Sequence, residues 1–265
     1  MFSLFRKENR PSAADAMERG IVLKNLPVKG LSLPPLDQLE AISANWSAQD
    51  RADFDHECRE TYATQIEELR RTGLWEKMES EERNFIRTGP YGLWPQAQLD
   101  AMWLAESIAC LLWALGRANK LPDYDQETGE KIIRGSPDDT DTVKDLVAGA
   151  KLRPAKEIDE QRDLAELWHW RCRTHQLIES GHKFAELPPE TTIDGIIKMA
   201  ANQAGQVHDF VPIDDDFPAF AKPFRNATDQ EFLLLRSIAQ ERHKALNWLC
   251  GYAPGNRWSE TPTDT

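Results

Sequence analysis

Apolar residues recur along the chain with helical spacing, and the residues between these runs predict where each helix begins and ends. Ser47 opens a Ser-x-x-Asp cap before a segment that runs to about Arg71. A short helix with an acidic start is expected after Ser80. Pro95 suits the first turn of the next helix, which closes at Gly116. The sequence shows no alternating strand pattern of useful length, so these elements predict a helical protein.

Three further helices are expected in the C-terminal half. One follows Pro154 and is stopped by Gly181. A second covers TTIDGIIKMAANQAG at 191–205. The last begins at Thr228, where a Thr-x-x-Glu pattern forms a capping box, and ends at Gly251. Together with the N-terminal helices, they predict an all-α fold.

Two polar stretches separate these helices. Residues 119–142 contain two prolines and two glycines and predict a connection with at most a short hairpin. Residues 207–227 contain three prolines and an Asp triplet and are expected to be irregular. Neither stretch forces a division into two units.

The helix between Pro95 and Gly116 should be the buried centre of the protein, because its apolar residues cover nearly every face. The remaining helices would then pack around it. The prediction is a single multi-helix globular domain over residues 13–265, preceded by a flexible N-terminal tail at residues 1–12.

Composition narrows the function classes. The formal net charge of −12 would repel a nucleic acid backbone, and no stripe of basic residues compensates for it. The longest apolar run, IACLLWALG, is too short to span a bilayer, and the N-terminus does not read as a secretory signal. The four cysteines are widely spaced and form no CxxC pair. We therefore expect a cytoplasmic protein that binds neither nucleic acid nor spans a membrane.

A permanent charge lies within the apolar face of the last helix. Arg242 falls in the middle of a face made by Leu235, Ile238, Ala239, Ala245, Leu246 and Leu249. Burying an unpaired guanidinium would cost many kcal/mol, so an acid or several carbonyl oxygens should meet it. Glu106 is likewise a single charged residue among the apolar residues of the central helix. The preferred prediction is a buried ion pair between Glu106 and Arg242.

The helix after Pro154 repeats this pattern, because Arg171 and His175 lie on its apolar stripe. One interpretation is an internal network of ion pairs that fixes the helices relative to one another. The other is a polar pocket in which Glu106 has a perturbed pKa and His175 acts as acid or base. The structural interpretation is preferred, since ion-pair networks also produce such constellations.

Other candidate residues are weaker. His243 and Asn247 are four residues apart and could hold a ligand or a metal, but a solvated or hydrogen-bonded surface is the preferred interpretation. His169 beside Trp168 and Trp170 could build an aromatic pocket, although tryptophans at helical spacing usually belong to the core. Trp103 is a further weak candidate. The triplet 214–216 could bind a cation but is expected to be solvated. No motif for a metal, a phosphate or a dinucleotide is present, so we expect neither metal nor cofactor.

Several short motifs, taken as an ordered set, resemble the bacterial family called domain of unknown function 4272. These motifs are Arg19-Gly20-Ile21, GLWEKMESEERNFI, Trp103 with Glu106, LLWALG at 111–116, Leu121-Pro122, Arg153 with Glu157-Ile158, ERHKALNWLCG at 241–251, and the terminal RWSETPTDT. The resemblance covers most of the chain. It implies a mostly helical, cytoplasmic bacterial protein and brings no established activity, cofactor or catalytic residue.

Two functional hypotheses remain open. The first is a protein-binding or regulatory module with an unidentified protein partner, because catalytic motifs are missing and the chain is acidic. The second is an enzyme or small-ligand sensor that binds an anionic ligand in a pocket lined by Glu106, Arg171, His175 and Arg242, since arginines in a dry cavity suit a carboxylate or phosphate. The sequence leaves catalysis and oligomeric state undecided.

Overall fold

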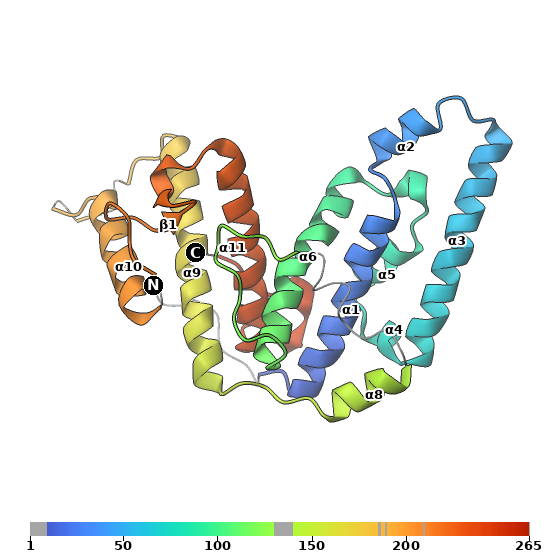
Figure 1. Cartoon of the computed structure of the whole chain (residues 1–265), viewed down its shortest axis with the longest axis horizontal. Coiled ribbons are helices and arrows are strands. Elements are labelled where there is room, and N and C mark those ends of the chain that lie inside the picture. Colours follow the sequence, from blue (N-terminus) through green and yellow to red (C-terminus); the bar gives the residue numbers. More distant parts are fainter. Residues whose placement is uncertain (1–9, 130–139, 185–186, 189, 209, 265) are drawn as a thin grey trace.

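The computed structural model describes residues 10–129, 140–184, 187–188, 190–208 and 210–264, which are mainly helical (Figure 1). The α-helices are α1 (Ala13–Ser32), α2 (Leu36–Ile42), α3 (Ala48–Arg71), α4 (Leu74–Lys77), α5 (Ser80–Arg87), α6 (Pro95–Ala114), α8 (Thr140–Ala148), α9 (Ala155–Glu179), α10 (Ile193–Val207) and α11 (Asp229–Leu249). Two-residue strands β1 (Pro218–Ala219) and β2 (Lys222–Pro223) form a small antiparallel hairpin. The expected all-α fold is confirmed.

The helix boundaries follow the capping signals in the sequence. At the start of α3, the Ser47 side chain accepts a hydrogen bond from the Asp50 backbone N–H, and the Asp50 side chain accepts from that of Ser47. Thr228 and Glu231 form the same reciprocal cap at α11. Gly116 follows α6 with φ of 69°, a left-handed conformation that ends a helix at little cost for glycine. Local chemistry therefore sets these boundaries.

Helix α1 was absent from the sequence prediction. Pro27 lies inside it, and Gly20 and Gly30 further weaken its helical pattern. Its start was nevertheless readable, since Ser12 and Asp15 form a capping box. Packing against α6 outweighs the weak local propensity, because most of the residues of α1 are buried.

Helix α6 lies at the centre of the helical array, as its apolar pattern predicts. It packs against α1 on one side and α11 on the other, and α11 packs in turn against α9 (Figure 1). Helix α10 lies beyond α9, while α3 lies on the far side of α1. Although α6 is largely apolar, no helix in the described part of the chain combines the length and hydropathy needed to cross a membrane.

The two polar stretches each differ from expectation. The connection predicted at 119–142 is shorter, because α8 begins at Thr140; residues 130–139 lie outside the described residues. The hairpin β1–β2 forms within the segment 207–227 that was expected to be irregular.

Residues 1–9 of the predicted tail are also outside the described residues, whereas Arg10 donates to both carboxylate oxygens of Asp159 at 2.5 Å. The tail prediction is therefore untested for 1–9.

A buried lysine joins α1 to the loop after α5. Lys29 is 2% exposed, and its Nζ lies 2.5, 2.7 and 2.6 Å from the carbonyl oxygens of Phe85, Ile86 and Thr88. The Tyr62 ring centroid is 4.0 Å from the same nitrogen. Burial lowers the pKa of Lys29 to about 7. Three carbonyl oxygens match the three N–H donors of the ammonium form, so this residue closes the end of α5.

We expect Lys29→Met to lower the free energy of unfolding by about 2–4 kcal/mol, because three carbonyl oxygens lose their donor. Urea denaturation measures this loss. The matched control is Lys156→Met, since the Lys156 side chain is 86% exposed; it should change stability by less than about 0.5 kcal/mol. Equal stability of the two variants would contradict a structural role for Lys29.

Candidate functional site

The predicted ion pair between α6 and α11 is present and fully buried. Arg242 donates from Nε to Glu106 Oε2 at 2.8 Å, and the two residues are 0% and 1% exposed. The other two guanidinium nitrogens of Arg242 donate to backbone carbonyls, Nη1 to Pro122 at 2.6 Å and Nη2 to Gln126 at 3.2 Å. Every nitrogen of this guanidinium therefore has an acceptor.

Glu106 binds the same stretch of backbone from the other side. Its Oε1 accepts from the Thr128 backbone N–H at 2.5 Å, and its Oε2 accepts from the Thr128 hydroxyl at 2.9 Å. The ion pair thus fixes three points of the loop at 117–128, in addition to joining α6 to α11. This loop could not be predicted as a partner from the sequence, because irregular segments lack a periodic pattern.

A second buried ion pair joins α9 to the segment before β1. Arg171 donates from Nε and Nη2 to the two carboxylate oxygens of Asp216, both at 2.8 Å. Asp216 also accepts from the backbone N–H groups of Phe217 and Arg225. Burial acts to raise the pKa of Asp216, but these donors, led by Arg171, hold it below its usual value. Asp216 is 0% exposed, so the expectation of a solvated triplet was wrong at this position.

The two ion pairs are separated by an aromatic layer, so the four predicted residues do not share one pocket. Tyr124 stacks on Trp168 with ring centroids 4.7 Å apart and an angle of 10°. The guanidinium of Arg242 lies 4.8 Å from the Tyr124 ring, and that of Arg171 lies 4.2 Å from the Phe224 ring. Since Phe224 also packs against Trp168, aromatic rings fill the space between the two charge pairs.

His175 lies beside the second ion pair, on the same cleft as Arg171 and Asp216, and not beside Glu106. Its ring is half-buried and lies 4.5 Å from the Phe232 ring and 5.6 Å from the Phe224 ring. Burial, followed by the charge of Arg171, lowers the pKa of His175. The structure therefore gives this histidine aromatic neighbours.

Arg171 and His175 border a cleft of about 560 Å³ between α9, α10 and the segment 214–226. The acidic residues along it are Glu179, Asp194, Asp214, Asp215 and Asp216, and the basic residues are Arg171, Lys198 and Arg225. This excess of acids disfavours an anionic ligand.

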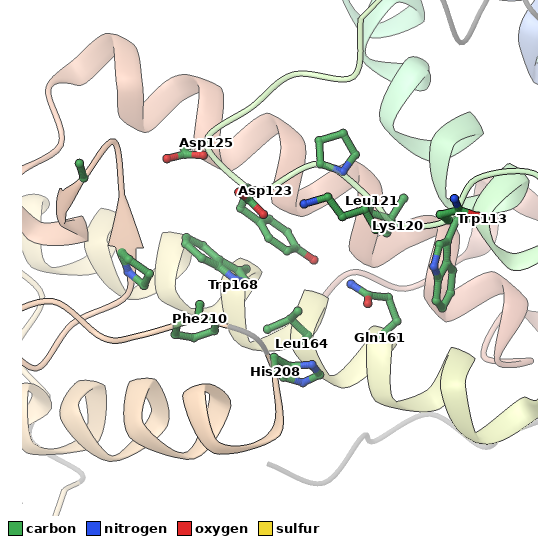
Figure 2. A pocket seen from close by; sticks show the side chains of 15 residues that line it. Trp113, Lys120, Leu121, Asp123, Asp125, Gln161, Leu164, Trp168, His208 and Phe210 are labelled. Carbon is green, nitrogen blue, oxygen red and sulfur yellow. The ribbon is translucent and has the colours of Figure 1, made fainter.

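A different cleft forms between the loop at 117–128, the segment 208–221 and α9. Its volume is about 360 Å³, and we call it the aromatic cleft. Its lining residues are Trp113, Asn119, Lys120, Leu121, Pro122, Asp123, Tyr124, Asp125, Gln161, Leu164, Trp168, His208, Phe210, Pro218 and Ala221. Figure 2 shows Gln161 and Leu164 below the loop residues Lys120 and Asp123, with Trp113 on one side and Phe210 on the other. The predicted candidate Trp168 thus contributes to this cleft.

The two segments that form the aromatic cleft also touch directly. The Phe220 backbone N–H donates to Asp125 Oδ2 at 2.7 Å. Phe220 and Ala221 form the turn between β1 and β2 and have φ of 54° and 58°. Left-handed backbone at residues other than glycine costs of the order of 1 kcal/mol each and is often found beside functional sites. Asp125 therefore holds a strained turn at the edge of the cleft.

Helices α6 and α11 diverge towards their N-terminal ends (Figure 1). A groove lies between the N-terminal halves of these two helices. Its volume is about 540 Å³, and we call it the α6–α11 groove. It is lined by Gln96, Leu99, Asp100, Trp103, Glu127, Gln230, Leu233, Leu234, Arg236, Ser237, Gln240 and Glu241. At its closed end the Ser107 hydroxyl donates to Glu241 Oε2 at 2.7 Å. The predicted candidate Trp103 lies here and not in the aromatic cleft.

His243 and Asn247 are buried, contrary to the preferred surface interpretation. Arg162 Nε donates to Asn247 Oδ1 at 2.7 Å, so the Asn247 amide nitrogen faces His243 Nε2 at 2.9 Å. His243 Nε2 is therefore an acceptor and its Nδ1 carries the proton, which it donates to His169 Nδ1 at 3.0 Å. Asn247 also donates to the Pro262 carbonyl. These groups form one hydrogen-bonded chain between α9, α11 and the C-terminal segment.

The sequence model of a family described as "Domain of unknown function (DUF4272)" matches residues 42–192, which is more than half of the chain. The chain belongs to the DUF4272 family. The family resemblance seen in the sequence is thereby confirmed, although the motifs at 19–21, 241–251 and 257–265 lie outside the matched residues. No curated protein and no solved structure matches the chain.

The DUF4272 segment and the C-terminal part of this chain build the candidate site together. Glu106 and Arg171 lie within the matched residues, whereas their partners Arg242 and Asp216 lie beyond them. The aromatic cleft follows the same division, since residues 113–168 form most of its lining and residues 208–221 complete it.

We expect Arg242→Ala to lower the free energy of unfolding by about 3–5 kcal/mol, because Glu106 would remain buried without its partner. Chemical denaturation measures the change. Glu106→Leu combined with Arg242→Met should be less destabilising than Arg242→Ala alone, since no unpaired charge remains. The control Arg173→Ala alters an exposed arginine of α9. A wild-type denaturation midpoint for Arg242→Ala would contradict the role given to the pair.

The buried histidines predict a loss of stability in mild acid. Burial is the main cause that lowers the pKa of His169 to about 4 and of His243 to about 3. The unfolded chain binds these protons near pH 6.5, so it gains protons that the folded protein does not. Stability from this source is present above pH 6.5 and falls as the pH decreases towards 4. The loss between pH 6.5 and 5 should be about 2 kcal/mol per histidine.

Urea denaturation at pH 7 and pH 5 tests this prediction. The double variant His169→Gln/His243→Gln should show a smaller difference in unfolding free energy between the two pH values than the wild type. His182→Gln, at an exposed position, serves as the control and should keep the wild-type difference. An unchanged difference in the double variant would show that other groups cause the acid sensitivity.

Proposed function

We propose that this DUF4272 protein is a protein-binding module whose α6–α11 groove receives a basic amphipathic helix of a partner protein. The observation that carries this proposal is a groove between two helices, with leucines that are exposed on both walls. Leu99 on α6 is 50% exposed, and Leu233 on α11 is 52% exposed. Both line the groove, together with Trp103 and Leu234, which are partly buried.

The shape of the groove favours a helix as the occupant. Its α11 wall runs from Gln230 to Glu241, which corresponds to about 16 Å or three helical turns. A third helix can lay its apolar face between two diverging helices, with anchors spaced three or four residues apart. Trp94, at the start of α6, is 78% exposed and offers an additional aromatic contact next to the groove.

Charge favours a basic partner. Asp100, Glu127 and Glu241 line the groove against a single arginine, Arg236. The whole chain has a formal net charge of −12, which speeds the approach of a positively charged segment and repels an acidic one. Lysines or arginines flanking the apolar face of the partner helix would meet the exposed carboxylates of Asp100 and Glu127 at the edge of the groove.

The groove supports protein binding better than the Glu106–Arg242 pair supports an anionic-ligand pocket. Each nitrogen of the Arg242 guanidinium already donates to Glu106 or to a loop carbonyl, and the side chain is 0% exposed, so it is closed to a carboxylate or phosphate ligand. The cleft beside Arg171 has more acids than bases along its lining. Arg171 keeps one buried nitrogen, Nη1, without a hydrogen-bond partner among the described residues, but the acids around it disfavour an anionic ligand.

A synthetic helix tests the proposal directly. We expect a peptide of leucine and lysine in amphipathic order to bind the protein, as measured by fluorescence anisotropy, and a leucine–glutamate peptide of the same length not to bind. Leu99→Glu combined with Leu233→Glu should weaken binding at least tenfold. Both residues are half-exposed, so the melting temperature should change little.

The matched control is Met199→Glu combined with Val207→Glu, which introduces the same two charges at residues of α10 that are 62% and 63% exposed and lie outside the groove. It should bind the basic peptide as the wild type does. Equal weakening by this control would show that the peptide recognises only general surface charge. Failure of the basic peptide to bind the wild type would contradict the proposed occupant.

A further inference from the structure

The aromatic cleft contains a buried hydroxyl that the fold itself does not satisfy. Tyr124 is 6% exposed and lines the cleft, and its hydroxyl has no hydrogen-bond partner among the described residues. A buried hydroxyl without a partner costs roughly 1–3 kcal/mol. Phenylalanine would give the same stacking on Trp168 without that cost, so the hydroxyl needs another explanation.

Two further polar residues of the cleft carry uncharged hydrogen-bonding groups. Gln161 is half-buried on α9 and offers an amide with both donor and acceptor atoms. His208 is also half-buried, and burial lowers its pKa below the ordinary value, so its ring is neutral at pH 7. Tyr124, Gln161 and His208 together can donate to and accept from an uncharged ligand. Leu164, Trp168 and Phe210 provide apolar and aromatic surface beside them.

The charged residues of the cleft argue against a phosphorylated ligand. Asp123 and Asp125 line it together with one lysine, Lys120. Two carboxylates against one ammonium group, in a chain of net charge −12, repel an added phosphate. Carboxylates do accept hydrogen bonds from sugar hydroxyls and exocyclic amines.

We propose that the aromatic cleft binds an unphosphorylated heteroaromatic molecule of the nucleoside class. Such a ligand has apolar ring faces for the aromatic surface and alternating donors and acceptors on its edge for Gln161, His208 and the Tyr124 hydroxyl. Its sugar hydroxyls suit Asp123 at the open side. The volume of about 360 Å³ lies within the range of small-molecule sites.

The cleft is preorganised for a ligand. The Glu106–Arg242 pair fixes its loop wall, the Arg171–Asp216 pair fixes the segment opposite, and the bond from Phe220 N–H to Asp125 joins the two. A rigid site loses little entropy on binding. The strained turn at Phe220 and Ala221 is retained at the edge of this cleft.

Isothermal titration of the full chain with adenosine, guanosine, cytidine and uridine tests the proposal. We expect at least one nucleoside to bind, and its 5′-monophosphate to bind at least tenfold more weakly. Tyr124→Phe should weaken binding of that nucleoside about tenfold, which corresponds to the loss of one hydrogen bond. The melting temperature of the variant protein should stay the same or rise. A purely structural tyrosine would not separate binding from stability in this way.

Gln161→Met should weaken binding of the same nucleoside. The control Gln203→Met, at an exposed position of α10, should leave that binding unchanged. The absence of binding by all four nucleosides at millimolar concentration overturns the proposal, as does tighter binding of the monophosphate. Leu99→Glu combined with Leu233→Glu lies outside the cleft and should bind the nucleoside normally. This result distinguishes a failure of the cleft from a failure of the α6–α11 groove.

Discussion

The structure depends on the removal of one guanidinium and one carboxylate from water. Arg242 and Glu106 are almost completely buried, and neither charge is tolerable without the other. Their mutual attraction does not fill all of their hydrogen-bonding capacity, so the remaining donors and acceptors take backbone groups of Pro122, Gln126 and Thr128. A loop without regular structure thereby acquires a fixed position, because moving it would leave buried charged groups without partners.

The Arg171–Asp216 pair applies the same constraint to a second irregular segment. Asp216 binds the guanidinium with both oxygens and also accepts from two backbone N–H groups, which places the chain just before β1. Tyr124 and Trp168 then stack between the two charge pairs. The aromatic cleft lies where these two fixed segments meet, so its walls are set by buried charge instead of by a continuous sheet or helix.

Parts of this arrangement were predictable from local pattern. The caps at Ser47 and Thr228 and the lone charges Glu106 and Arg242 in apolar helical faces are visible in the sequence, because helical periodicity reports which side chains are buried. Helix α1 was not predicted because Pro27 interrupts its pattern. The burial of Asp216 was not predicted because an acid in a Pro-rich segment is usually solvated, and only the tertiary fold brings Arg171 to it. The burial of His243 likewise depends on how α9 packs against α11, which no single helix reveals.

The Glu106–Arg242 pair, which joins α6 to α11, connects the two candidate sites physically. Glu241 lines the α6–α11 groove and accepts from Ser107, while its neighbour Arg242 stacks on Tyr124 and holds the loop of the aromatic cleft. The groove opens on the N-terminal side of these contacts, where the helices diverge and leucines remain exposed. A change in the separation of α6 and α11 would therefore act on the Arg242 guanidinium and on the loop carbonyls it binds. One buried ion pair thus joins the two helices that wall the groove and holds the loop that walls the cleft.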